Sequence, residues 1–337
     1  MYPLTFPAGL LLAVQLTVGV PVSEAQLQQA VTSALPPLRD AAVGHIAQKS
    51  CFGCHNQGPP VTALHAARHR GYRAFSAADS KEQITHIHEF LATNEQRYRR
   101  GQGTGGQVDT AGTLLLALEQ NGDLPSPLTE AVVEYLLQVQ SQRDFWKCSS
   151  NRPPSEASDF TTTYLALRGL RVWGTPEQQP RIRKRQDRAR AWLLTTWPAD
   201  TEDAAFRLLA LREVKADREA ISKATEDLLS RQSWNGGWCQ KPGMTPDAYA
   251  TGTALVAVNW SGVMPVSHRA YQRGLGYLIR TQRTDGTWMV ESRSKPFQPY
   301  YEGGFPHGKA QFISSTASGW ATLALILATP PSRHGEN

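Results

Sequence analysis

A short pattern recurs along the chain and limits which folds the chain can adopt. In each copy a glutamine is followed six residues later by a tryptophan, over residues 140–146, 232–238 and 282–288. The last two copies also carry glycine four residues after the glutamine, whereas Asp144 stands at that position in the first. A half copy ends at Trp192 and lacks the loop. Self-similarity of this kind indicates an array of related structural units.

Two kinds of helix are predicted around these loops. Segments before the loops carry one apolar stripe at helical spacing, whereas segments after them are apolar nearly all round. The apolar segments are residues 160–170, 202–214, 248–258 and 314–328. Residues of N-cap type stand at several expected starts, namely Thr201, Asp247 and Ser314. A helix that is apolar nearly all round can be buried between a one-stripe helix and a shared interior. Stacking such hairpins side by side gives an all-α solenoid or a closed ring, which is the fold that the sequence predicts.

The repeated loops resemble the QW motif of the terpenoid cyclase and protein prenyltransferase superfamily, which includes the squalene–hopene cyclases. The resemblance implies an α/α toroid, in which two rings of helices enclose a cavity, here with about six hairpins of ~45–50 residues. The stretch 282–308 looks like exported bacterial proteins with cyclase-type repeats. The resemblance also implies that the motif residues are structural and not catalytic, namely Gln140, Gln232, Gln282, Trp146, Trp238 and Trp288.

The acid of the cyclases has only a weak counterpart in this chain. Cyclases protonate their substrate with an aspartate in a D-x-D-D stretch at the start of an inner helix. The nearest match runs from Glu156 to Asp159, with Ser158 at the central acid position. Glu156 and Asp159 are therefore weak catalytic candidates, and Asp159 is more simply interpreted as a helix N-cap.

Two further features bear on catalysis. The segment that resembles the zinc-binding histidine region of the prenyltransferases has Ala250 in place of the histidine, which disfavours zinc-dependent prenyl transfer. The aromatic stretch 296–308 contains Glu302 and His307, a weak candidate acid/base pair at one mouth of the expected cavity. No substrate follows from either feature.

Residues 51–55 form a C-x-x-C-H motif, which is the attachment signature of c-type haem. The spacing lets Cys51 and Cys54 form thioethers with the two vinyl groups of one porphyrin, while His55 reaches the iron as the proximal ligand. Pro59 and Pro60 follow at a distance where c-type cytochromes often place a proline carbonyl that orients the histidine. The sequence therefore predicts covalent haem c held by Cys51, Cys54 and His55, with His55 as the metal ligand.

Other uses of the cysteine pair remain open. A thioredoxin-like redox pair needs a βαβ setting, which the pattern lacks. A structural zinc site needs more ligands, and His45, His65 and His69 are near in sequence. A disulfide between Cys51 and Cys54 is the third alternative. The sixth ligand of a haem iron is open between Met244, Met264, Met289, His65, His69, His86, His88 and His307.

The N-terminal segment predicts export. An apolar run over residues 7–21 has the length of a signal peptide, although no Lys or Arg precedes it, and Ser23-Glu24-Ala25 fits a cleavage site. We therefore expect a periplasmic or otherwise extracytoplasmic protein that is not transmembrane after signal removal. The predicted divisions are a signal peptide over 1–25, a haem-attachment hairpin over 26–75, toroid repeats over 76–330 and a disordered tail over 331–337.

Composition narrows the function classes. The 337 residues are 40% hydrophobic and 19% charged, which excludes a disordered chain. The net charge of +6 is not concentrated as a nucleic-acid footprint would be, and the basic stretch 181–192 is predicted to be the solvated face of an outer helix. The favoured function is an exported haem protein for electron transfer or redox sensing with a redox partner protein. The alternatives are an enzyme or binding protein for a terpenoid, polyprenyl or other hydrophobic ligand, and a scaffold without chemistry.

Overall fold

The computed structural model of the protein describes residues 21–296 and 299–329, and within these ranges the chain is almost entirely helical. The predicted all-α fold is confirmed. Most of the predicted signal peptide and the tail over 331–337 lie outside the described residues.

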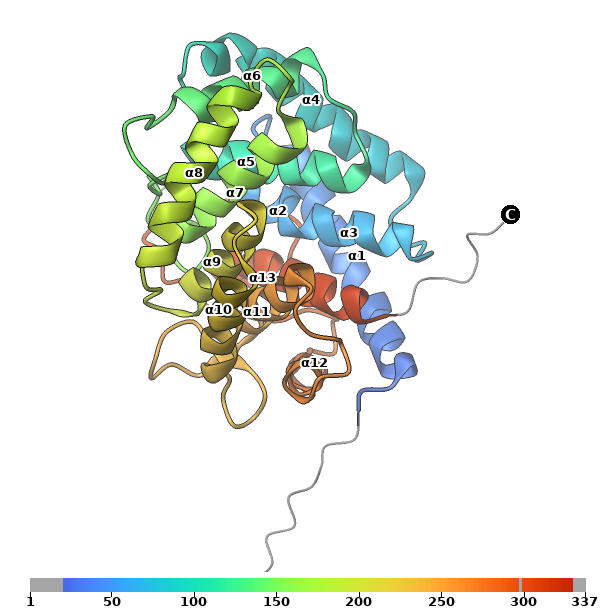
Figure 1. The fold of residues 1–337 in the computed structure, drawn as a ribbon. Helices are drawn as coiled ribbons and strands as arrows, with labels where there is room; N and C mark the ends of the chain where they lie inside the picture. Colours follow the sequence, from blue (N-terminus) through green and yellow to red (C-terminus); the bar gives the residue numbers. More distant parts are fainter. Residues whose placement is uncertain (1–20, 297–298, 330–337) are drawn as a thin grey trace, which may run out of the picture.

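Two concentric rings of helices make up the described structure (Figure 1). The inner ring consists of α3 (Pro59–His69), α5 (Gln107–Asn121), α7 (Asp159–Trp173), α9 (Thr201–Glu213), α11 (Ala248–Ser261) and α13 (Gln311–Ala328). The outer ring consists of α1 (Glu24–Gln48), α4 (Ala77–Arg99), α6 (Pro127–Gln138), α8 (Gln179–Thr195), α10 (Arg218–Ser230) and α12 (Arg269–Thr281). The remaining elements are α2 (Cys54–Gln57), the 3₁₀ turn η1 (Gly308–Ala310) and the antiparallel strands β1 (Trp238–Cys239) and β2 (Pro246–Asp247).

The inner ring is closed. Each inner helix contacts the next along the chain, and α13 contacts α3, so the last inner helix packs beside the first. The described helices therefore form six outer–inner hairpins, and residues 26–75 supply the first of them. This arrangement confirms the predicted α/α toroid.

Burial follows the apolar pattern of the inner helices. The segment Gly308–Ala328 is the one described helix long and apolar enough to cross a membrane, and 83% of its apolar window is buried inside the ring. The inner helices can pack closely because glycine, which has no side chain, stands at two of their contacts. A Cβ on Gly252 of α11 would lie 2.7 Å from the backbone of α13, and one on Gly319 of α13 would lie 2.6 Å from Pro59 of α3. Larger residues there would push the ring apart.

The tryptophans of the repeated motif join each outer helix to the next inner helix. All three are buried, and the indole N–H of each donates to the carbonyl oxygen ten residues earlier at 2.8–3.0 Å. The backbone N–H of each donates to a hydroxyl group on the following inner helix. The three sets are Leu136–Trp146–Thr163, Leu228–Trp238–Thr251 and Leu278–Trp288–Ser318.

The glutamines of the motif link neighbouring hairpins. Gln232 donates to the carbonyl oxygen of Ala270 on α12 at 2.8 Å, and Gln282 donates to that of Ala30 on α1 at 2.8 Å. The second bond ties the last outer helix to the first and so helps to close the outer ring. Gln140 instead donates to Lys147 within its own loop. These contacts confirm the structural role expected for the motif.

The predicted helix starts are correct at one of three positions. Asp247 caps α11 by accepting a hydrogen bond from the backbone N–H of Ala250, as expected. Thr201 is not the cap of α9, because Asp200 accepts the bond from Asp203. Ser314 is also wrong, since α13 begins three residues earlier, at Gln311, without a side-chain cap. Helix ends are poorly determined by pattern because a polar residue one position away can cap equally well.

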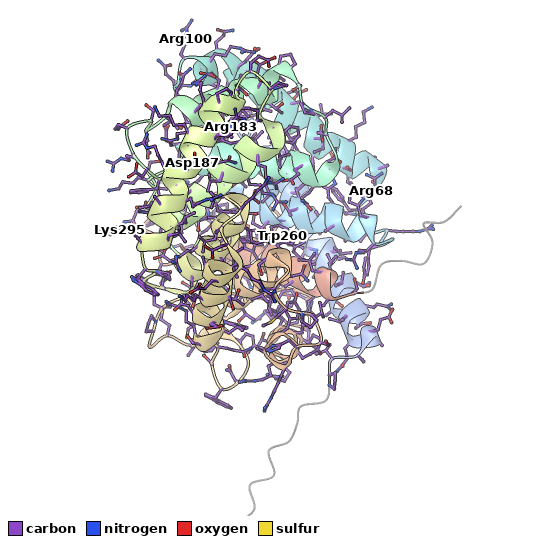
Figure 2. All side chains as sticks on the ribbon, in the orientation of Figure 1. Arg68, Arg100, Arg183, Asp187, Trp260 and Lys295 are labelled. Carbon is purple, nitrogen blue, oxygen red and sulfur yellow. The ribbon has the colours of Figure 1, made fainter. Side chains whose placement is uncertain are left out.

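The basic stretch 181–192 lies on α8, on the outside of the ring. Figure 2 shows Arg183 and Asp187 projecting from the outer face of this helix. Arg185 is the exception, because its guanidinium is buried over the ring of Trp146, 3.8 Å from the centroid. The expected solvated basic face is thus present, with one arginine packed inward.

We expect Trp238→Ala to lower the free energy of unfolding by about 3–5 kcal/mol, because the substitution removes a large buried aromatic side chain and the shorter of the two hydrogen bonds that the Leu228 carbonyl accepts. Trp234→Ala is the matched control in the same loop, since Trp234 is 92% exposed and its loss should change stability by less than about 0.5 kcal/mol. Urea denaturation followed by circular dichroism gives both values. Equal effects of the two substitutions would contradict the structural role of Trp238.

Candidate functional site

A cavity of about 840 Å³ opens at one end of the ring. Its walls come from the first hairpin around residues 45–56, from the loops that enter α5 and α7, and from the described part of the segment 289–313. These loops meet because they lead into inner helices that all begin at the same end of the ring. The volume lies within the ~300–1,000 Å³ typical of small-molecule and cofactor sites.

The C-x-x-C-H motif lies in the wall of this cavity, in the loop between α1 and α3. It occupies the place in the first hairpin that the glutamine–tryptophan loops occupy in later ones, as the repeat pattern predicts. Cys51, Cys54 and His55 all line the cavity. The backbone carbonyl of His55 accepts hydrogen bonds from Ser315 and Thr316 of α13, so the motif is anchored to the last inner helix.

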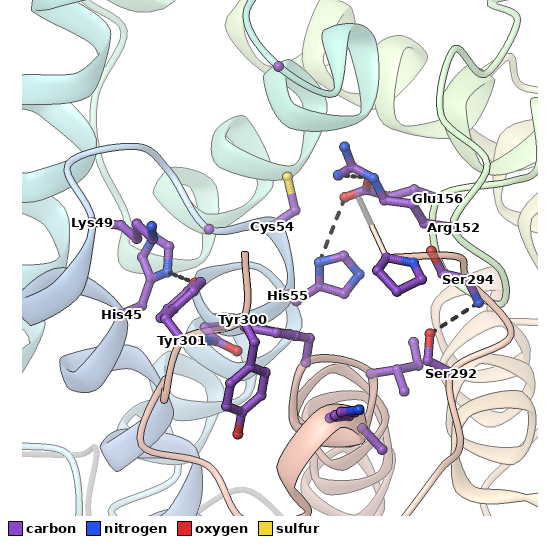
Figure 3. A pocket seen from close by; sticks show the side chains of 18 of the residues that line it. His45, Lys49, Cys54, His55, Arg152, Glu156, Ser292, Ser294, Tyr300 and Tyr301 are labelled. Carbon is purple, nitrogen blue, oxygen red and sulfur yellow. Dashed lines mark hydrogen bonds and ion pairs between the residues drawn. The ribbon is translucent and has the colours of Figure 1, made fainter. Parts of the chain in front are cut away.

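The imidazole of His45 contacts both the loop that carries the motif and the side chain of Tyr301. Its Nε2 lies 2.7 Å from the carbonyl oxygen of Cys51, and its Nδ1 lies 2.9 Å from the hydroxyl group of Tyr301. Burial lowers the pKa of His45. A Cβ on Gly53 would lie 2.5 Å from the imidazole of His45, so glycine at this position lets the ring approach the loop. Figure 3 shows His45 and Tyr301 joined on one side of the cavity.

His55 faces the carboxylate of Glu156. Figure 3 shows the imidazole beneath Glu156, with Nδ1 4.0 Å from Oε1. Burial lowers the pKa of His55, and the charge of Glu156 opposes that effect. The imidazole is therefore neutral near pH 7, which is the form that ligates metals. Among the described residues no hydrogen bond joins the His55 ring to Pro59 or Pro60, which are the first two residues of α3, so the orienting role of a proline carbonyl stays a prediction for the haem-bound form.

The two cysteines of the motif differ in environment. Cys51 is exposed, whereas the Sγ of Cys54 lies 3.1 Å from the hydroxyl group of Thr110 on α5. Burial, together with the charge of Glu156, raises the pKa of Cys54 well above its usual range. Both sulfur atoms are free thiols in the structure, so the two cysteines are not joined by a disulfide.

A buried carboxyl group that sequence reasoning missed lies near the cavity wall. Asp109, in the first turn of α5, accepts hydrogen bonds from Thr162 at 2.6 Å and from the thiol of Cys148 at 3.3 Å. Burial raises the pKa of Asp109 to about 7. The signal in the sequence was an acid directly after the glycine-rich stretch 101–106 and at the start of an apolar run.

Of the three weak catalytic candidates, the structure places two in the cavity wall and one outside it. Glu156 lines the cavity, but Asp159 does not, and its Oδ1 accepts the backbone N–H of Cys148. The interpretation of Asp159 as N-cap is wrong, because Ser158 caps α7 and Asp159 is the first helical residue. His307 lines the cavity.

Glu302 and His307 have different partners. His307 contacts the hydroxyl group of Thr287 at 2.8 Å, and Glu302 accepts a hydrogen bond from Tyr300. They are therefore not joined as an acid/base pair.

Two of the eight proposed sixth ligands line the cavity, Met289 and His307. Two of the candidate histidines have other partners: His86 contacts Gln57 and the Lys49 carbonyl, and His88 contacts Asp123. The remaining four are outside the cavity wall, namely Met244, Met264, His65 and His69. Among the described residues no group of three or more His, Cys, Asp or Glu side chains could hold a metal ion, so the extra ligands that a structural zinc site needs are not brought together there.

Comparison with known proteins gives similarity of fold. No protein-family model and no curated protein matches the chain. Solved structures do match, including the type II terpene cyclase MstE from Scytonema without ligand, with 15% identity over 92% of this chain and 99% of that chain and a TM-score of 0.57. A variant of MstE bound to its product merosterolic acid A matches with 17% identity over 91% and 98% of the two chains and a TM-score of 0.58.

A second class of enzyme shares the architecture. An unsaturated glucuronyl hydrolase variant from Streptococcus agalactiae matches with 12% identity over 93% of each chain and a TM-score of 0.56. Identities this low establish the α/α toroid fold and no shared activity.

We expect the contribution of Asp109 to stability to fall as pH rises from about 4 to 7, because the pKa of its carboxyl group is about 3.9 in the unfolded chain and about 7 in the folded one. A carboxyl group with a raised folded pKa contributes stability that is lost as pH rises through that value. Asp109→Asn removes this titration, so relative to wild type the variant should be on the order of 2 kcal/mol more stable at pH 8 than at pH 5.

The measurement is urea denaturation of both proteins at the two pH values. Asp187→Asn on the exposed face of α8 is the matched control and should show no pH-dependent difference from wild type. If the difference between Asp109→Asn and wild type is the same at pH 5 and pH 8, the buried carboxyl group does not titrate as described.

Proposed function

We propose that the protein is a c-type haem protein whose haem is covalently attached inside the cavity of an α/α toroid. The observation that carries the proposal is the position of the C-x-x-C-H motif in the wall of a cavity of about 840 Å³, with both thiols free. Cys51 and Cys54 would hold the porphyrin through thioethers, and His55 would ligate the iron. When bound, the haem would supply one-electron chemistry, which suits electron transfer or redox sensing.

The cavity lining is compatible with such a group. Aromatic and aliphatic side chains form apolar walls, as a porphyrin plane needs, and they include Phe52, Phe90, Phe312 and Ile313. Cationic side chains near the mouth could pair with two propionates, namely Lys49, Arg152, Lys295 and Lys309. The proposed export to an extracytoplasmic compartment is consistent with haem c attachment and stays a prediction.

A second candidate function is the binding of a hydrophobic small molecule. The apolar walls of the cavity favour it, and the solved toroids of similar fold include one bound to a merosterolic acid and one bound to geranylgeranyl dihydroxybenzoate. Within this candidate, Glu156 and His307 are the two weak catalytic candidates that stand in the cavity wall, where they could exchange protons with a ligand. Both functions are possible in one protein only if haem and a hydrophobic ligand fit into the cavity together.

We expect wild-type protein produced with a haem c maturation system to carry one covalent haem, seen as the bis-thioether pyridine haemochrome spectrum of denatured, washed protein. Cys51→Ala and Cys54→Ala should each shift the spectrum to that of a single thioether or abolish attachment, because each removes one bond. Cys239→Ala is the matched control, since Cys239 is a free cysteine outside the cavity wall. Absence of covalent haem from the wild type would overturn the proposal.

We also expect geranylgeranyl dihydroxybenzoate to raise the Tm of haem-free protein by a few degrees if the cavity binds prenyl compounds, since a ligand at 100 times its Kd stabilises by about 2.7 kcal/mol. Phe312→Glu should remove the shift by placing a charge in the apolar wall. Leu124→Glu, at a side chain that is 81% exposed and outside the cavity, should keep it. An unchanged Tm in wild type would exclude this ligand class.

A further inference from the structure

The carboxylate of Glu156 is buried, preorganised and incompletely partnered. We propose that Glu156 is the positioning residue of the haem ligand, holding His55 with the proton on Nδ1 so that Nε2 is free for the iron. This inference rests on the proposed haem function and goes beyond it, because it assigns a second residue, 101 positions away in the sequence, to the same site.

The geometry of the two side chains carries the inference. Oε1 of Glu156 lies 4.0 Å from Nδ1 of His55, and the side chains are 5% and 16% exposed. That oxygen is buried and receives no hydrogen bond, with the His55 imidazole and the Cys54 thiol as its neighbours. A buried carboxylate oxygen without a donor is costly, and a small rotation of the imidazole would satisfy it.

The other oxygen is already fixed in place. Oε2 of Glu156 accepts a hydrogen bond from Nη1 of Arg152 at 2.8 Å. The backbones of the same two residues are bridged, since Arg152 N–H donates to the Glu156 carbonyl at 2.8 Å and Glu156 N–H donates back at 3.3 Å. The loop therefore holds Oε1 toward the cavity whether or not a ligand is present.

Covalent attachment of haem would favour the contact between Glu156 and His55. A thioether at Cys54 has no S–H with which to donate to Glu156, whereas the Nδ1–H of His55 remains. Ligating histidines generally donate their second ring N–H to a carboxylate or carbonyl group, which fixes the tautomer and raises ligand basicity. Glu156 fills that role in place of the proline carbonyl that the motif led us to expect.

The first experiment needs no haem. In reduced, haem-free protein labelled with ¹⁵N-histidine, two-dimensional NMR at pH 8 reports which ring nitrogen of His55 is protonated, with His55→Asn used to assign the signals. Wild type should hold the Nδ1–H tautomer. In Glu156→Gln, Arg152 should attract the amide oxygen and turn the amide N–H₂ toward Nδ1, so the tautomer ratio should shift at least tenfold toward Nε2–H.

The second experiment uses the haem-loaded protein. A carboxylate on Nδ1–H strengthens the histidine as a donor to ferric iron, so Glu156→Gln should raise the midpoint potential by at least a tenfold change in the one-electron equilibrium, which is 59 mV. Glu291→Gln is the matched control for loss of charge, since Glu291 lines the same cavity with an exposed side chain; it should leave the tautomer unchanged and shift the potential less than Glu156→Gln does.

The outcomes separate the two proposals. An Nε2–H tautomer in wild type, or a tautomer and potential that Glu156→Gln leaves unchanged, would overturn the role of Glu156 even if haem is attached. Failure of the wild type to acquire covalent haem would overturn the proposed function, while the NMR result would still decide whether Glu156 sets the tautomer of His55. A tautomer shift that is absent from Glu291→Gln, together with a larger shift in potential than Glu291→Gln gives, would support the assignment.

Discussion

The hydrogen bond from a buried indole N–H to a carbonyl oxygen ten residues earlier is the contact on which the ring depends. That carbonyl lies near the C-terminal end of an outer helix, where carbonyl groups lack partners within the helix. Trp238 and Trp288 each satisfy one such group and fill the space between outer and inner helix, and their backbone N–H groups hold the start of the next inner helix. The direction of each hairpin is therefore set locally, and the ring closes because the turn is repeated.

Closure places the chemistry-bearing loops at one end of the ring. Every inner helix begins at that end, so residues that immediately precede inner helices meet there although they are far apart in the chain. In the first hairpin residues 51–55 stand at the place that a glutamine–tryptophan loop occupies in the third, fifth and sixth hairpins. His45 and Gly53 brace that replacement loop, and α13 receives the backbone of His55. A loop that has lost the indole anchor is thus held by an imidazole from its own outer helix.

The fold was predictable to a large extent because its determinants are local. Period, loop spacing and apolar helices lie within about 50 residues of one another, and they led to the correct hairpins. The contacts that join hairpins were not predictable: the pairing of Glu156 with His55 and that of Asp109 with Thr162 arise from closure of the ring, and the sequence does not show which distant residue each acid meets.

Glu156 stands just before the inner helix α7 and in the cavity wall, so its position links the fold to the proposed function. In the resembling cyclases an acid at the start of an inner helix acts on substrate, and the equivalent end of α7 here also carries acids. Asp159 is the first residue of α7 and accepts the backbone N–H of Cys148, whereas Glu156 precedes the helix and lines the cavity. Oε2 of Glu156 is held there by a hydrogen bond from the guanidinium of Arg152. Of the two acids, Glu156 is therefore the one placed to orient the imidazole of His55, which is the role proposed for it.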